Sequence, residues 1–443
     1  MKLLSPAISK LARIRLWRIQ NWINHPVASQ RDTLQTLVTA AQYTDFGKKY
    51  QFSQLFTVKD FKERVPIHEY EELKPYIERM LAGEENVLWN TPVKWFAKSS
   101  GTTNDKSKFI PVSDESLVDN HFQASKDVIT TYYKNFPASD LLTGKALVIG
   151  GSHQVSKIND DIQCGDLSAV LMQNTPFWGQ WIRTPELSIA LLDEWESKIE
   201  QLAQTTADEN VTSLAGVPTW TLLLLKRILA IKNKKTIAEV WPNLELYING
   251  GVSFVPYRKQ FDAIIGKPIN YLEIYNASEG FFAAQQQPDD DGMMLFTEHG
   301  IFYEFMPVED YGKANAKTVG LKSVQVSKNY AIIISTSGGL WRYLVGDTVK
   351  FTSLNPYKIK VSGRLKHYMN AFGEEVIVDN SDKAIAVAAE KTNAIVSDYT
   401  AAPVYFSENS NGAHEWLVEF DKPPGSIQNF AIELDTALKD LNS

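Results

Sequence analysis

Residues 96–113 read FAKSSGTTNDKSKFIPVS, with a run of small and hydroxyl-bearing residues from Ser99 to Thr103 between two apolar runs. The flanking runs, VKWFA and KFIPV, are typical of short strands, so we expect a hairpin that carries the polar loop at its tip. Small residues leave backbone N–H groups and hydroxyls free to converge on an anion, while a lysine supplies the opposing charge. The loop therefore indicates a phosphate site, with a polar surface turn as the alternative.

The order of residues in this loop argues against the commonest class of ATP-binding protein. That class carries the pattern GxxxxGK[ST], which stretch 96–113 does not contain. We therefore do not expect an ordinary P-loop NTPase.

The composition is that of a globular protein with several layers of structure. A chain of 443 residues is too long for one simple core, so we expect two or more domains. A hydrophobic content of 44%, with 11 Trp, 18 Tyr and 21 Phe, excludes long disordered regions. The formal net charge of −7 argues against nucleic acid as the main partner.

The single cysteine, Cys164, cannot form an internal disulfide, and no signal peptide is recognisable, so we expect a reducing, cytoplasmic location. No stretch approaches the roughly 20 apolar residues of a membrane span. Residues 4–19 have apolar side chains at helical spacing and a basic side. We expect this helix to dock on the first domain, with a membrane-surface helix as the alternative.

The order of predicted elements indicates an α/β fold. Residues 1–95 read as a helical lead-in, after which β-rich and helical runs alternate. We predict a large N-terminal domain of layered β-sheets and helices over 1–360, and a small, mobile α+β domain over 361–443. Ligands of open α/β sheets bind beyond the carboxyl ends of strands, where we expect Gly250–Gly251 and Asn276–Gly280.

Nearly the whole chain resembles the auxin-responsive acyl-acid amido synthetase family of the adenylate-forming superfamily. The resemblance is carried by the runs TDFGKKYQF, DFKERVPIHEYEELKPYIERM and GEENVLWNTPVKWFAKSSGTT, in the form that bacterial members of the family show. It implies an ATP-dependent ligase that joins a carboxylic acid to the amine of an amino acid. ATP and Mg²⁺ are the implied cofactors.

In that family the Ser-Ser-Gly-Thr-Thr/Ser loop embraces the ATP phosphates, and its residues here are Ser99, Ser100, Gly101, Thr102 and Thr103. The family's lysine corresponds to Lys108. Asp105 departs from the pattern, because it stands where a second glycine is usual and adds negative charge near a polyphosphate. Lys106 is placed to offset that charge.

A second motif, YNASEG, resembles the segment that sets an aromatic ring against adenine and a carboxylate near Mg²⁺. It assigns nucleotide binding to Tyr275, Asn276, Ala277 and Ser278, and catalysis with metal binding to Glu279. A carboxylate is a suitable Mg²⁺ ligand, although a solvated loop carboxylate is the alternative. The upstream glycines, Gly250 and Gly251, resemble the turn whose backbone lies against the base.

The third motif, RYLVGD, resembles the family's Tyr-Arg-x-Gly-Asp. It implies that Tyr343 and Gly346 belong to the nucleotide site and that Asp347 binds the ribose hydroxyls, although an aspartate after a glycine is also an ordinary turn residue. Leu344 stands where the family often has arginine, so no arginine is assigned there.

The fourth motif, SGRLKHYMNAFGEE, resembles the superfamily hinge, about which the small domain rotates after adenylation. Gly363, Arg364, Lys366 and Gly373 match it, with Arg364 expected at the nucleotide and Lys366 in the chemistry. Asn370 replaces the usual lysine. Rotation of this kind needs only a few residues to absorb the change.

The acid-binding residues are harder to find. The run AGVPTWTLLLL resembles the segment that lines the acyl site, which makes Val217, Thr219 and Trp220 candidates, with core packing as the alternative for Trp220. His121 and His153 are possible bases, but a structural histidine is the preferred interpretation of each.

The resemblance leaves two alternatives to amide ligation: an acyl-CoA synthetase and a non-catalytic nucleotide-binding relative. The second is suggested by Asp105, by Asn370 and by the expectation, from the resemblance, that the C-terminal part is shortened or lacks the lysine that assists adenylation. We favour amide ligation because the N-terminal runs resemble that family and not the thioester formers.

Overall fold

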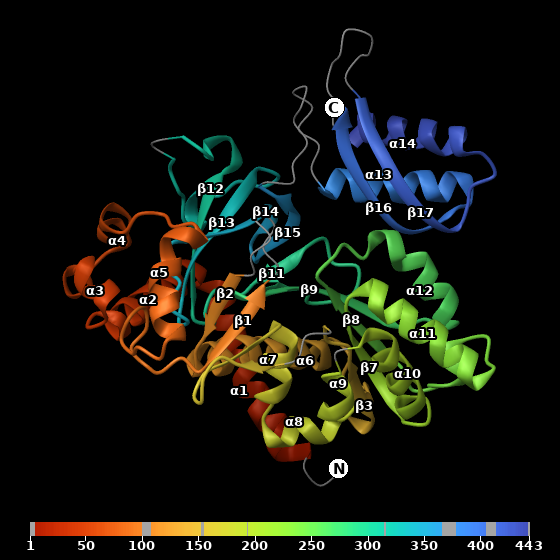
Figure 1. Ribbon diagram of the computed structural model, residues 1–443, viewed down its shortest axis with the longest axis horizontal. Helices are drawn as coiled ribbons and strands as arrows, with labels where there is room; N and C mark the ends of the chain where they lie inside the picture. Colours follow the sequence, from red (N-terminus) through yellow and green to blue (C-terminus); the bar gives the residue numbers. More distant parts are fainter. Residues whose placement is uncertain are drawn as a thin grey trace.

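The computed structural model describes residues 5–99, 108–151, 155–192, 194–313, 316–365, 378–404 and 413–441. Figure 1 shows N-terminal helices at one side, a central body of β-sheets covered by helices, and a C-terminal group of helices and strands at the upper right. The α/β fold class predicted from the sequence is confirmed. In the described ranges, no helix combines the length and apolar character that crossing a membrane requires.

The lead-in is helical, as predicted, and its helices are α1 (Ser5–Asn24), α2 (Pro26–Ala41), α3 (Asp45–Lys49), α4 (Val58–Arg64) and α5 (Tyr70–Leu81). Helix α4 begins with a capping box in which Thr57 and Asp60 satisfy each other's backbone N–H groups. Gly83 follows α5 with φ +91°, a conformation that glycine adopts without strain.

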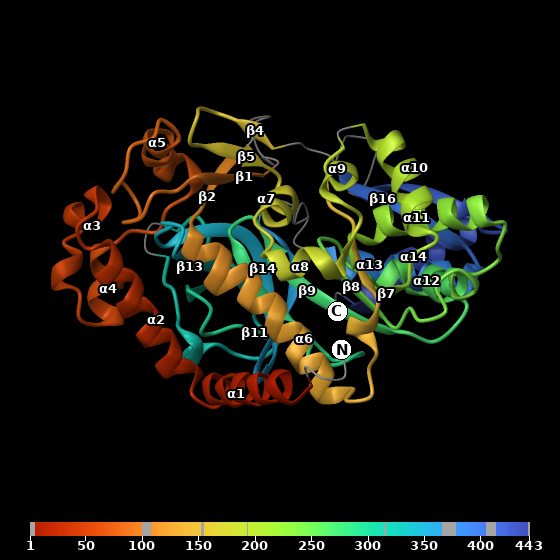
Figure 2. The same cartoon turned by 90° about the horizontal axis from the view of Figure 1, so that it is seen from below.

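Helix α1 docks on the body of the protein, as expected, through side chains from Arg15 to Trp22. Arg15 forms an ion pair with Asp127 of α6 (Gln123–Asn135) at 2.6 Å, and Ile19 and Trp22 are buried beside it. Figure 2 shows α6 lying across the sheet with α1 near it. Arg15 is therefore directed into the protein, where it pairs with Asp127.

In the described part of the chain, eleven strands form one large sheet whose first half is parallel. Its order is β6 (Arg183–Thr184), β3 (Lys145–Val148), β7 (Val211–Gly216), β8 (Leu246–Gly250) and β9 (Asn270–Ala277). Side chains alternate between its faces: Leu246 and Leu272 pack toward α6, whereas Tyr247 and Tyr271 pack toward the helices opposite.

The opposite face is covered by α10 (Trp195–Thr206), α11 (Pro218–Lys232) and α12 (Arg258–Ile265). Leu222, Leu224 and Leu225 of α11 are buried in this core, whereas Leu223 is exposed. Three short helices follow the small sheet along the chain: α7 (Leu167–Gln173) packs against that sheet, α8 (Phe177–Ile182) contacts β6, and α9 (Leu187–Ala190) contacts α10.

The second half of the large sheet is antiparallel and continues through β10 (Gly280–Ala284), β11 (Met293–Leu295), β15 (Tyr357–Arg364), β14 (Tyr343–Leu354), β13 (Asn329–Thr336) and β12 (Ile301–Pro307). β13 is almost wholly buried, since the lead-in helices cover one of its faces. The YNASEG motif at the end of β9 and the RYLVGD motif on β14 therefore belong to the same sheet.

A smaller sheet carries the polar loop. Within the described ranges it has the order β2 (Lys108–Val112), β1 (Trp95–Ser99), β5 (Gln163–Gly165) and β4 (Ser156–Lys157). β1 and β2 are antiparallel, with Ser99 opposite Lys108, so the predicted hairpin is confirmed. Residues 100–107 of the loop itself lie outside the described residues.

The C-terminal residues have a hydrophobic core of their own. α13 (Val378–Thr392) and α14 (Ile427–Leu441) pack against the antiparallel pair β16 (Ile395–Val404) and β17 (Ala413–Lys422), which agrees with the α+β character predicted there. Contacts with the large sheet's helices include a 2.9 Å hydrogen bond from Gln260 to the Val396 carbonyl.

Candidate functional site

The carboxyl ends of β7, β8 and β9 lie next to one another because these strands are parallel neighbours. Gly250 ends β8, and a Cβ there would lie 2.7 Å from the carbonyl oxygen of Ile274, so the close approach requires glycine. Gly251 adopts φ +86°, and its missing Cβ would face Val217 at 3.3 Å. The predicted glycine turn and the YNASEG turn therefore leave the sheet side by side.

A hydrogen bond joins the second and third motifs. The Tyr275 hydroxyl donates to Oδ2 of Asp347 at 2.8 Å, and Arg364 Nε lies 3.0 Å from Oδ1 of the same carboxylate. Asp347 sits in an irregular stretch of β14, where Gly346 has φ +94°, and it pairs across the sheet with Arg364. One carboxylate thus connects residues from three predicted motifs.

The environment of Tyr275 keeps its hydroxyl protonated. Burial raises the pKa of Tyr275 well above its ordinary value, and the nearby Asp347 carboxylate raises it further. Its ring packs against Phe282 at 4.8 Å between centroids and the residue is buried. Tyr275 therefore acts as a donor that orients Asp347, and its predicted stacking on adenine stays a prediction.

Glu279 lies in the turn after β9, close to several charges. Burial, and to a smaller extent the Asp347 carboxylate, raise the pKa of its carboxyl to about 7, whereas a backbone hydrogen bond, Lys108 and Arg364 oppose the shift. These influences put Lys108, Asp347 and Arg364 in electrostatic range of one carboxyl group. A carboxyl with this pKa can take up or release a proton near neutral pH, and a cation beside it favours the ionised form.

Lys108 is held by a tyrosine that the sequence did not single out. Its ammonium lies 5.6 Å from the ring centroid of Tyr70, and the Tyr70 hydroxyl accepts a hydrogen bond from the N–H of Phe109 at 2.8 Å. Tyr70 belongs to the run YEELKPYIERM, whose family resemblance gave no role for it. A contact between residues this far apart in sequence becomes visible only in the fold.

Two side chains of the RYLVGD motif are directed inward. Tyr343 is fully buried, and its hydroxyl has no hydrogen-bond partner among the described residues. Burial raises the pKa of Tyr343 well above its ordinary value, and the negative charge of Glu279 also contributes to the increase. Arg342 adopts φ +44°, and its guanidinium binds Glu304 at 2.8 Å and the carbonyls of Lys62 and Val65, which ties α4 to this strand.

His121 is buried behind the YNASEG turn, in the helical turn η3 (Ser116–Phe122). Burial lowers the pKa of His121 to about 4, against an opposing influence of the Asn276 side chain. His121 Nδ1 and Asn276 Oδ1 each have no hydrogen-bond partner within the described ranges. His121 is therefore neutral at pH 7 and buried, as in the structural interpretation, although its hydrogen bonding is incomplete.

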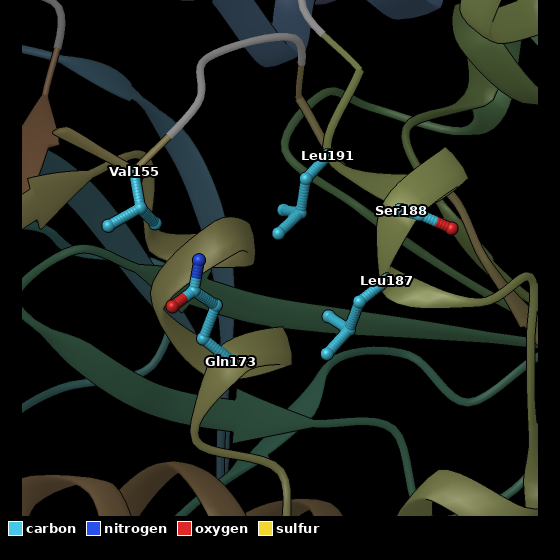
Figure 3. Close-up of a pocket in the computed structure, with 5 residues that line it drawn as sticks. All are labelled: Val155, Gln173, Leu187, Ser188 and Leu191. Carbon is cyan, nitrogen blue, oxygen red and sulfur yellow. The ribbon is translucent and has the colours of Figure 1, made fainter.

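A cavity of about 410 Å³ lies at the same edge of the sheet, beyond the carboxyl ends of β3 and β6. Figure 3 shows its described lining, which consists of Val155, Gln173, Leu187, Ser188 and Leu191. The side chains of Leu187 and Leu191 point toward its centre. The cavity was not predicted from the sequence, because its lining residues lie in short apolar runs without a recognisable pattern.

The predicted acid-site residues are not among the described residues that line this cavity. Val217 faces Gly251, and the Trp220 ring packs on Trp195 of α10 at 5.4 Å between centroids. Thr219 lies in the first turn of α11.

Several predicted site residues lie outside the described residues: Ser100, Gly101, Thr102, Thr103, Asp105, Lys106, His153, Lys366, Asn370 and Gly373. Ser99 is described at the end of β1, opposite Lys108. Among the described residues, no group of three or more His, Cys, Asp or Glu side chains could hold a metal ion. A single carboxylate such as Glu279 suits Mg²⁺ that is also bound by phosphates.

Three consecutive segments match one protein family. Residues 15–269 match the GH3 family N-terminal domain, 294–364 the GH3 family central domain and 379–443 the GH3 family C-terminal domain. The chain therefore belongs to the GH3 family, and the family resemblance seen in the sequence is confirmed.

Relatives of known activity are named as acid–amino acid ligases. The chain is 23% identical over 427 residues to the indole-3-acetic acid-amido synthetase GH3.4 of Arabidopsis thaliana, covering 79% of this chain and 69% of that protein. It is 24% identical over 446 residues to the jasmonoyl–L-amino acid synthetase JAR4 of Nicotiana attenuata, covering 86% and 76%.

Solved structures share the fold. The AtGH3.15 acyl acid amido synthetase in complex with 2,4-DB has a TM-score of 0.80 at 18% identity, covering 98% of this chain and 85% of that chain. A 2-hydroxyisobutyryl-CoA ligase in the postadenylation state in complex with 2-HIB-AMP has a TM-score of 0.61 at 13% identity, covering 93% and 82%. The fold is therefore that of adenylate-forming enzymes.

Proposed function

We propose that this protein is an ATP-dependent acyl-acid amido synthetase. It adenylates a carboxylic acid, releases pyrophosphate, and transfers the acyl group to the amine of an amino acid with release of AMP. The observation that carries the proposal is the cluster in which Asp347 is bound by Tyr275 and Arg364 beside the carboxyl of Glu279. The lone cysteine, Cys164, is buried and free, and we place the reaction in the cytoplasm.

In the first half-reaction, a carboxylate oxygen of the acid attacks the α-phosphorus of ATP and pyrophosphate leaves. We propose that Lys108, at the start of β2, neutralises phosphate charge next to the loop of Ser99 to Thr103. Glu279 is the residue that would hold Mg²⁺, which when bound supplies charge neutralisation and orientation of the phosphates. Positioning and electrostatics account for most of such a displacement.

Asp347 is proposed to accept hydrogen bonds from the ribose hydroxyls. Its side chain is 13% exposed and is fixed on two sides by Tyr275 and Arg364. A carboxylate oriented before the nucleotide arrives loses less conformational entropy on binding. The Arg364 side chain is 50% exposed, so it can also contact the nucleotide.

In the second half-reaction, the amino acid's amine attacks the acyl carbonyl and AMP leaves. We propose that the small domain, predicted over residues 361–443, rotates between the two steps, without residues 361–364, which belong to β15 of the large sheet. Exposed ion pairs such as Lys259–Glu390 (3.0 Å) and Lys226–Asp421 (2.6 Å) link it to α11 and α12, and such pairs contribute little stability. Because Arg364 pairs with Asp347 across β14 and β15, the rotation would begin after Arg364.

We propose that the acid's tail occupies the cavity beyond β3 and β6, with Val217, Thr219 and Trp220 along the approach to the nucleotide. Its volume, about 410 Å³, lies within the range of small-molecule sites, roughly 300–1,000 Å³. A row of close contacts runs from the cavity to the glycine turn: Met172 packs on Gly150, Ile149 on Gly216, and Val217 on Gly251. An acid in the cavity would therefore lie on the same edge as the nucleotide.

The test is pyrophosphate release from ATP and Mg²⁺ with a panel of aryl and fatty acids, before and after amino acids are added. Release that depends on one acid and accelerates with an amine supports amide ligation, with the amide confirmed by mass spectrometry. A thioester formed with coenzyme A, and no amide, would instead select the acyl-CoA synthetase. ATP binding without pyrophosphate release for any acid would select the non-catalytic alternative.

A further inference from the structure

Tyr70 joins the helical lead-in to the strand that follows the phosphate loop. It is the first residue of α5, it is buried, and its hydroxyl accepts a hydrogen bond from the N–H of Phe109 at 2.8 Å. β2 is the edge strand of the small sheet and pairs with β1 on one side. An edge strand leaves backbone groups unpaired on its other side, and Tyr70 satisfies one of them.

The same tyrosine holds the lysine that precedes Phe109. The Lys108 ammonium lies 5.6 Å from the centroid of the Tyr70 ring, within the range of a cation–π interaction. The hydroxyl of Tyr70 therefore fixes the backbone of β2, and its ring restricts the ammonium one residue earlier. Two contacts on consecutive residues limit where Lys108 can point.

We propose that Tyr70 is a positioning residue for adenylation, which fixes Lys108 toward the phosphates of ATP. The proposal rests on the proposed role of Lys108 in the reaction. Because the long, flexible lysine stem loses rotamer freedom on binding, a ring that restricts it beforehand lowers the cost of ATP binding. Tyr70 need not touch the nucleotide to have this effect.

A purely structural role for Tyr70 is the competing explanation, and the chain offers a matched control on the same helix. The ammonium of Lys49 lies 5.5 Å from the ring centroid of Tyr76 and 2.9 Å from its hydroxyl. Tyr76 of α5 thus makes the same kind of contact with a lysine as Tyr70 does, but its lysine belongs to the lead-in helix α3 (Asp45–Lys49). A general loss of helix packing should therefore affect variants at both positions.

The experiment compares Tyr70→Phe, Tyr70→Leu and Tyr76→Leu in the full chain, with thermal unfolding recorded for each. Removal of the hydroxyl should raise the Michaelis constant for ATP about threefold to tenfold, since the Phe109 N–H loses its acceptor. Tyr70→Leu, which also removes the ring, should raise it further, by about tenfold or more. The Michaelis constant for the acid should stay unchanged, and Tyr76→Leu should leave both constants unchanged.

A double-mutant cycle with Lys108→Ala separates positioning from stability. If Tyr70 acts through Lys108, then Tyr70→Leu should have almost no further effect on ATP binding in the Lys108→Ala background. Additive effects, or equal effects of the Tyr70 and Tyr76 variants, would overturn the proposal. If Lys108→Ala itself leaves ATP binding and pyrophosphate release unchanged, the proposed role of Lys108 fails, and the role of Tyr70 with it.

Discussion

The hydroxyl of Tyr275 donates a hydrogen bond to Asp347 across 72 positions of sequence, at 2.8 Å. The two residues lie on β9 and β14, which are separated in the large sheet by β10, β11 and β15. The bond therefore spans a bend of the sheet and fixes the Asp347 carboxylate relative to the YNASEG turn. The proposed contacts to ribose and to the Mg²⁺-bound phosphates are linked through this one hydrogen bond.

Replacing Asp347 should affect both ATP use and stability. We expect Asp347→Ala to raise the Michaelis constant for ATP about tenfold or more, because charge-assisted hydrogen bonds to the ribose are lost. The buried Tyr275 hydroxyl would lose its acceptor, which should cost about 1–3 kcal/mol of unfolding free energy. Steady-state kinetics and thermal unfolding check this, with Asp291→Ala, an exposed surface carboxylate, as the control. An unchanged Michaelis constant would argue against ribose contact.

Replacing Lys108 should slow the first half-reaction. Lys108→Ala removes the positive charge at the end of the phosphate loop, and we expect pyrophosphate release to slow by about tenfold or more. Lys98→Ala is the matched control, because Lys98 is an exposed lysine on the paired strand β1. Equal rates in the two variants would contradict the assignment of Lys108 to the ATP phosphates.

The sequence predicted the architecture and the turns that carry the candidate site residues, because both depend on local patterns. The hairpin around the polar loop, the glycine turn after β8 and the YNASEG turn after β9 follow from strand periodicity and turn residues. Their assignment to ATP came from the family resemblance. The GH3 domains matched along the chain are consistent with that source.

The missed residues are those that act through tertiary contacts. Tyr70 lies 39 positions from Phe109, and an ordinary tyrosine at the start of a helix carries no local signal of that contact. The cavity combines residues from α7, α9 and the segment at Val155, so its lining is not contiguous in sequence. Similarly, the sequence places Arg15 on the basic side of a helix, but in the structure its side chain points inward and pairs with Asp127.

The pH dependence of adenylation should depend on Mg²⁺ through Glu279. Its carboxyl pKa is raised to about 7, chiefly by burial, so the free enzyme becomes ready to bind the cation as pH rises through that value. A bound cation favours the carboxylate and lowers this pKa. We expect the acid limb of the pH–rate profile to move to lower pH as the Mg²⁺ concentration increases.

The ionisation of Glu279 should affect stability and adenylation in opposite directions. As pH rises, stability should fall while adenylation becomes faster. Because the folded-state pKa of Glu279 lies above its ordinary value of 4.5, its contribution to stability is greatest below pH 4.5 and is lost as pH rises to about 7. Denaturant unfolding of the nucleotide-free protein should show this loss, and Glu279→Gln should remove it. A Glu279→Gln variant whose pH profile and Mg²⁺ dependence match the unaltered protein would contradict both expectations.

Filling the cavity should change acid selectivity and leave ATP binding intact. Leu191 points toward the cavity centre, so Leu191→Trp should exclude long or aromatic acids while short acids still enter. Loss of several buried contacts to the acid should lower kcat/KM for large acids by about tenfold or more. The Michaelis constant for ATP should not change, because the cavity lies beyond β3 and β6 and the nucleotide motifs follow β8 and β9.

The control for this variant is Leu223→Trp, which adds the same volume to an exposed position of α11. Initial rates of pyrophosphate release with a graded series of acids would compare the two variants directly. If Leu191→Trp lowers the rate equally for small and large acids, the substitution acts on folding or on the adenylation step in general. If it leaves every acid unaffected, the acid binds elsewhere, and the approach lined by Val217, Thr219 and Trp220 becomes the next place to test.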